Sequence, residues 1–107
     1  MEDLVPIEIN LNVDPQQVDE SFLRTFGFLT NTLLKHMFAG HSAPAKIRGT
    51  PGQLSAFADA LGKEKRYMDS FLRHGLNDEI TLSDRSSLMR AVASFERETG
   101  LRWPYSS

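Results

Sequence analysis

The chain of 107 residues contains no cysteine. This absence excludes disulfide bonds, thiolate zinc sites and a cysteine nucleophile, and it favours a cytoplasmic location over secretion. The sequence also lacks any apolar run near the roughly 18 residues that span a membrane, and its acidic start lacks the basic end of a signal peptide. We therefore expect a soluble, cytoplasmic protein without a membrane partner.

Basic charge is not in excess. The 12 Lys and Arg residues are outnumbered by 14 Asp and Glu residues, which leaves a formal net charge of -2. General nucleic-acid binding depends on a broadly basic surface, so any such surface here must be local. Hydrophobic residues make up 40% of the chain and include seven Phe. This content is enough for the core of one domain that spans residues 1–107.

Familiar motifs of catalysis and metal binding are also missing. The chain has no HExxH metal motif, no glycine-rich phosphate loop followed by Lys and Ser or Thr, and no GxSxG nucleophile elbow. His36, His41 and His74 do not share the spacing of metal ligands. We therefore predict no enzymatic activity, no cofactor, no metal and no small-molecule substrate.

Capping signals and helical periodicity predict a mainly α fold. Asp14 followed by Pro15, Thr50 followed by Pro51, and Ser83 are typical helix starts. Gly40 and Gly100 are natural helix ends. Helices are predicted at residues 14–39, 50–74 and 83–99, with a loop at residues 40–49. Their apolar stripes predict a core that contains Phe22, Phe26, Leu29, Leu33, Phe57, Leu61, Met68, Phe71, Leu88, Val92 and Phe95.

Residues 1–13 are predicted to form an extended arm or edge strand. Apolar and polar residues alternate from Val5 to Val13, which is typical of a strand with one buried face. A lone strand leaves its backbone groups unpaired, so it needs a partner. Short candidates lie around Ile47 and from Ile80 to Leu82. The alternatives are an arm that lies on the helices and pairing with a second copy of the chain.

The stretch from Leu54 to Gly75 carries a helix-turn-helix pattern. Six residues occupy the positions that the pattern requires, namely Phe57, Ala58, Leu61, Gly62, Met68 and Phe71. This stretch, about a fifth of the chain, resembles the helix-turn-helix family of DNA-binding domains. The resemblance implies a turn at Gly62, four helices in all, and a transcriptional regulator that binds DNA. Its contact residues for DNA would be Lys63, Lys65, Arg66, Tyr67 and Arg73, which are also the candidate contacts for a partner protein.

One unbroken helix is the competing interpretation of the same stretch, and we favour it. The turn position after Gly62 is usually apolar, whereas this chain has Lys63. The apolar seven-residue repeat also continues across Gly62, with a break only at Glu64 and Lys65, and one Gly costs a helix about 1 kcal/mol. In this interpretation Lys63, Lys65 and Arg66 face water, and Glu64 and Asp69 partly neutralise them.

The C-terminal tail, residues 100–107, is rich in aromatic surface. Trp103 and Tyr105 flank Pro104 and form a candidate hook for a partner protein. The alternative, which we favour, is that the tail folds back over its own core. The predicted function is a non-enzymatic protein-protein interaction module, an adaptor or inhibitor that uses a helical face and its arm or tail. Its partner would be another protein or a second copy, and DNA binding is the alternative.

Overall fold

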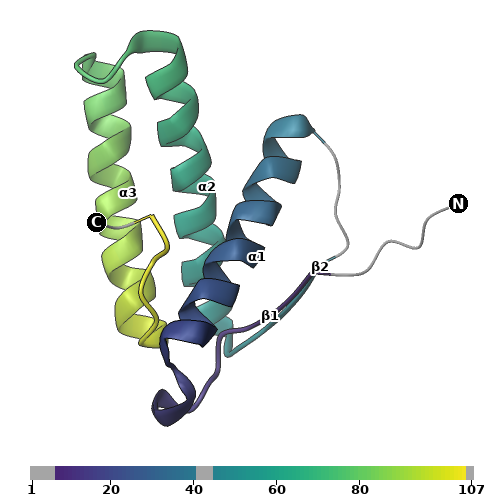
Figure 1. Cartoon of the computed structure of the whole chain (residues 1–107). Coiled ribbons are helices and arrows are strands. Elements are labelled where there is room, and N and C mark those ends of the chain that lie inside the picture. The colour runs from purple at the N-terminus through teal and green to yellow at the C-terminus, as the bar shows by residue number, and fades with distance from the viewer. Residues whose placement is uncertain (1–6, 41–44, 106–107) are drawn as a thin grey trace, which may run out of the picture.

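The computed structural model describes residues 7–40 and 45–105, which form three helices and a two-stranded sheet (Figure 1). The elements are β1 (Ile7–Asn10), a 3-10 turn (Pro15–Gln17), α1 (Glu20–Ala39), β2 (Ala45–Arg48), α2 (Pro51–His74) and α3 (Glu79–Thr99). This architecture confirms the predicted mainly α fold with three helices and an N-terminal edge strand. The part of the predicted arm at residues 1–6 lies outside the described residues.

The two strands run parallel, with α1 as the connection between them. Ile9 stands opposite Ile47 in the register, so the segment around Ile47 is the partner that β1 requires. The predicted loop at residues 40–49 is therefore corrected, because residues 45–48 form β2. The backbone N–H of Leu11 donates to the carbonyl of Arg48 over 2.7 Å and extends the pairing by one residue.

The alternation of apolar residues in β1 is matched by alternating burial. Ile7, Ile9 and Leu11 are buried, whereas Glu8 and Asn10 are exposed. The buried residues belong to the same core as the helices. One face of the small sheet therefore closes the side of the core next to α1.

The first helix starts later than predicted. Asp14 and Pro15 begin only the 3-10 turn, and α1 begins at Glu20, where the side chain of Asp19 accepts a hydrogen bond from the Phe22 N–H over 2.8 Å. Val18 ends the turn with a non-helical backbone and packs against the core. Two Asp caps therefore lie five residues apart, and the non-helical backbone of the half-buried Val18 separates the turn from the helix.

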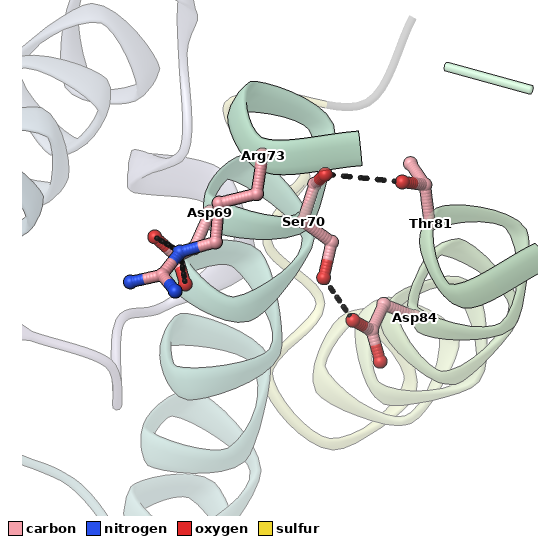
Figure 2. A network of polar contacts seen from close by, with 5 residues as sticks. All are labelled: Asp69, Ser70, Arg73, Thr81 and Asp84. Atoms are coloured by element: carbon pink, nitrogen blue, oxygen red, sulfur yellow. Dashed lines mark hydrogen bonds and ion pairs between the residues drawn. The ribbon is translucent and has the colours of Figure 1, made fainter. Parts of the chain in front are cut away.

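The third helix starts earlier than predicted, at Glu79, and its cap is Asp78 in place of Ser83. The Asp78 side chain accepts from the Ile80 N–H over 2.9 Å. The first turn is also held to α2, because the buried Thr81 hydroxyl donates to the Ser70 carbonyl over 3.2 Å. The Ser70 hydroxyl in turn forms a hydrogen bond with Asp84 (Figure 2). These contacts keep residues 79–82 helical.

The second helix is unbroken from Pro51 to His74 and passes through Gly62. The turn at Leu61–Lys63 that a helix-turn-helix requires is absent, so the fold has three helices and not four. Thr50 and Gln53 form the predicted capping box, with hydrogen bonds of 3.1 and 2.9 Å. The continuous-helix interpretation is confirmed.

An aromatic cluster joins the three helices and the tail. Phe26 of α1, Phe57 of α2, Phe95 of α3 and Trp103 of the tail have neighbouring ring centroids 5.1–6.1 Å apart. Most of the predicted core residues are buried or pack against the buried set. The prediction that Phe71 belongs to the core was wrong, because this residue is 42% exposed. It lies near the free end of the α2–α3 hairpin, and Figure 1 shows α1 diverging from the hairpin in that direction.

Gly62→Ala is expected to raise the free energy of unfolding by about 0.5–1 kcal/mol, because alanine suits a helix interior better than glycine. An added Cβ at position 62 would meet nothing within 4 Å. Urea unfolding followed by circular dichroism measures the change. Gly75→Ala is the matched control, since Gly75 has φ 86° and ψ 169°, a conformation that costs other residues about 1–3 kcal/mol. A less stable Gly62→Ala variant would contradict an unbroken helix.

Candidate functional site

A carboxyl group is buried in the middle of α2. Glu64 is 3% exposed, and its Oε1 accepts a hydrogen bond from the indole Nε1 of Trp103 over 2.8 Å. Glu64 follows Phe57 by seven residues and precedes Met68 by four, so helix geometry places it on the face of α2 that packs inward. The helix therefore directs a charged side chain toward the core.

The tail supplies the partner of this carboxyl group. Gly100 ends α3 in the left-handed conformation with φ 74°, and the chain then turns back along the hairpin. The backbone N–H of Trp103 donates to Glu96 Oε2 over 2.8 Å, while the indole ring meets Phe57 and Phe95 edge-on. Trp103 is 1% exposed and so is packed in the core of its own chain.

A pocket of about 440 Å³ opens between α2, α3 and the tail. Polar and aromatic side chains line it together with apolar residues of α3, and the chemically informative ones are Glu64, Tyr67, Arg85, Glu96, Trp103 and Tyr105. Two carboxyl groups, one guanidinium and three aromatic rings therefore meet at one hollow. We call this hollow the Glu64 pocket.

Burial controls the electrostatics of the pocket. Desolvation raises the pKa of Glu64 above the ordinary value of 4.5, and the hydrogen bond from Trp103 offsets part of this rise. Burial and the nearby charge of Glu64 raise the pKa of Tyr105 as well. The Tyr105 hydroxyl donates to Asn31 Oδ1 over 2.9 Å, which links the pocket wall to α1. Within residues 7–40 and 45–105, no basic side chain forms an ion pair with Glu64.

The predicted contact residues of α2 lie on more than one side of the helix. Lys63 pairs with Asp59 one turn earlier, with Nζ and Oδ1 2.9 Å apart. Lys65 places its Nζ 5.3 Å from the ring centroid of Phe38 in α1, a cation–π contact. Because residues two apart lie on opposite sides of a helix, Lys63 and Lys65 point in different directions.

The other three predicted contacts have different surroundings. Arg66 is exposed, and Arg73 pairs with Asp69 over 3.3 Å (Figure 2). Tyr67 alone among the five lines the Glu64 pocket. In the tail, Trp103 is buried and Tyr105 is half-buried, so the tail folds back over the core, and Trp103 is not presented to a partner.

Sequence reasoning placed Glu64 on a solvated face, and this was wrong. A signal was present, because Glu64 interrupts an apolar stripe that continues on both sides of it in Leu61 and Met68. A single carboxyl group inside such a stripe indicates a buried charge with a specific partner. The partner, Trp103, lies 39 residues away, and no local pattern connects the two.

A second distinctive surface lies at the free end of the α2–α3 hairpin. It consists of large apolar side chains that are 42–74% exposed, namely Phe71, Leu72, Leu76, Ile80 and Leu82. We call this surface the hairpin tip. Other exposed large apolar side chains occur singly on α1 and α3, at Phe28, Phe38 and Met89.

Neither a metal site nor a membrane span is found in the described part of the chain. No three His, Cys, Asp or Glu side chains there are grouped closely enough to hold a metal ion. None of the three helices is both long and apolar enough to cross a bilayer. The cytoplasmic location stays a prediction.

Comparison of the chain with protein-family models, with curated proteins and with solved structures found no match. The two surfaces described above are therefore the features of the molecule that bear on its function.

Glu64→Gln is expected to change the pH dependence of stability, because glutamine keeps the acceptor for Trp103 but cannot ionise. The folded protein holds the Glu64 proton more tightly than the unfolded chain, since the folded-state pKa lies above 4.5. The favourable contribution of this proton is complete below pH 4.5 and is lost as pH rises through the raised pKa. The wild type should therefore lose stability relative to Glu64→Gln as pH rises through that window.

Urea unfolding at a series of pH values measures this difference. The matched control is Glu98→Gln on the exposed face of α3, which should follow the wild-type pH profile. Parallel profiles for the wild type and Glu64→Gln would show that the carboxyl group is not desolvated.

Proposed function

We propose that the protein is a non-enzymatic interaction module, an adaptor or inhibitor, that binds a partner protein through the hairpin tip. The observation that carries this proposal is the gathering of five large apolar side chains within 12 residues of sequence, from Phe71 to Leu82. Single exposed apolar residues are normal on a protein surface, whereas a concentration of them at one end of a hairpin is typical of an interaction site.

The hairpin tip is preformed. The hydrogen bonds of Ser70 with Thr81 and Asp84 hold the last turns of α2 to the first turns of α3 (Figure 2). The Asp78 cap fixes the start of α3. A surface that is already ordered loses little conformational entropy when it binds, so more of the apolar contact contributes to affinity.

The partner that fits this surface is an amphipathic helix. Near the N-terminal half of α2 the hairpin is covered by α1, and the three helices share one core. Toward the free end α1 diverges, and no other helix of residues 7–40 and 45–105 lies against the hairpin there (Figure 1). A helix from a partner protein would occupy the third position and bury the tip, as in other helical bundles. The DNA-binding alternative is not proposed, because α2 is unbroken where that alternative requires a turn.

A photo-crosslinking residue at position 72, which is 74% exposed in the wild type, tests the proposal. The matched control carries the same residue at position 97, an exposed site in the last turn of α3 at the other end of the hairpin. Irradiation in cells that produce the protein should give a discrete protein adduct from position 72 and none from position 97. Ile80→Glu, introduced together with the position-72 probe, should abolish the adduct.

Ile80→Glu should leave the fold intact, because Ile80 is exposed and an acidic residue is favourable in the first turn of a helix. Circular dichroism checks this, with an expected change in stability below about 0.5 kcal/mol. Irradiation of the purified chain alone identifies a second copy as the partner if a covalent dimer forms. Equal adducts at positions 72 and 97, or no adduct at position 72 in either setting, would contradict the proposal.

A further inference from the structure

We infer that the Glu64 pocket binds a small organic ammonium ion, with Glu64 as the counter-charge, the rings of Tyr67 and Tyr105 as the apolar and cation-attracting walls, and Trp103 as the residue that orients Glu64. This site is separate from the hairpin tip, and the inference does not depend on the proposed interaction function. A ligand of this class carries one positive charge and an apolar body, and both features have a complement in the pocket.

The charge balance of the pocket favours a monocation. Glu64 lines the pocket as a buried carboxyl group and forms no ion pair within residues 7–40 and 45–105, so its ionisation leaves one negative charge without a basic partner there. Arg85, the basic residue of the lining, is an exposed side chain of α3. An incoming ammonium group would supply the counter-charge that no described basic side chain supplies to Glu64.

The hydrogen bonding of Glu64 leaves one oxygen for a ligand. Trp103 Nε1 donates to Glu64 Oε1 over 2.8 Å. Within residues 7–40 and 45–105, Trp103 is the hydrogen-bond partner of the Glu64 side chain. The indole also fixes the orientation of the carboxyl group, so Oε2 is held in place before a ligand arrives. A preoriented acceptor in a desolvated site binds a cation more strongly than a carboxylate in water does.

The aromatic walls suit an alkylated ammonium ion better than a metal ion. The rings of Trp103 and Tyr105 have centroids 6.3 Å apart and planes inclined by 59°, so they form a corner and not a stack. Trp103 is 1% exposed and forms the closed back of this corner, whereas Tyr67 and Tyr105 are half-buried and line the pocket. The rings of the two tyrosines can attract an organic cation and at the same time cover its alkyl groups. A pocket of about 440 Å³ also lies in the range of small-molecule sites, about 300–1,000 Å³.

Binding can be measured through the fluorescence of Trp103, the only tryptophan of the chain. The probes are choline, tetramethylammonium and butylammonium, and the neutral control is dimethylbutanol, in which a carbon atom replaces the charged nitrogen of choline. At least one cation should change the emission in a saturable way. Dimethylbutanol should bind at least about tenfold more weakly than choline, because it lacks the interactions of the charge with Glu64 and the rings.

Variants assign the binding to the pocket. Glu64→Gln should weaken cation binding by at least about tenfold, and Tyr105→Leu should weaken it several-fold. Glu98→Gln on the exposed face of α3 should have no effect. Ile80→Glu at the hairpin tip should also leave cation binding unchanged, so the failure of one proposal can be told from the failure of the other.

The affinity should rise with pH through the raised pKa of Glu64, since the cation binds the ionised carboxyl group. The other charged or titratable groups of the lining are Glu96, Arg85, Tyr67 and Tyr105, and loss of the pH effect in Glu64→Gln assigns it to Glu64. The inference is overturned if none of the three cations gives a saturable change. It is equally overturned if dimethylbutanol binds as well as choline, or if Glu64→Gln binds as the wild type does.

Discussion

The contact between the Trp103 indole and the Glu64 carboxyl group is the interaction on which the rest of the structure depends. A buried indole N–H needs an acceptor, because an unpaired buried donor costs about 1–3 kcal/mol. Here the acceptor comes from the middle of α2, while the ring packs against Phe57 and Phe95. This hydrogen bond gives the indole N–H of Trp103 its acceptor and holds the Glu64 carboxyl group inside the protein. Both residues line the pocket.

The position of the tail also explains why one end of the hairpin is uncovered. The helix α1 is joined to the hairpin through the shared core and through the tail, where the Tyr105 hydroxyl donates to Asn31. Gly27 of α1 comes close to Pro104, since an added Cβ would lie 3.6 Å from its ring. These contacts hold α1 against the hairpin at the end where the tail lies. Farther along α2, the Lys65 and Phe38 contact bridges the diverging helices, and apolar side chains beyond it face solvent.

Local signals in the sequence were sufficient for the elements whose ends have one clear cap. The capping box at Thr50 and the left-handed glycines at positions 40 and 100 matched the structure. The starts of α1 and α3 were predicted wrongly because more than one residue could act as the cap, and the choice depends on tertiary contacts. Strand β2 has only four residues, so its periodicity is too short to identify it. The site depends on a pair of residues 39 apart, which no spacing rule within one helix can reveal.

The two surfaces share α2, and we expect the two proposed binding events to be independent of each other. Tyr67 lines the pocket, and Phe71 of the hairpin tip follows one helical turn later. Between them along the hairpin, Ser70 bonds to Thr81 and Asp84 and holds α2 against α3. Coupling of two sites requires an element with two arrangements that both ligands bias. A hairpin fixed by buried hydrogen bonds offers one arrangement, so a cation in the pocket would leave the shape of the tip unchanged. The physical division of α2 therefore favours two separate binding surfaces over a switch.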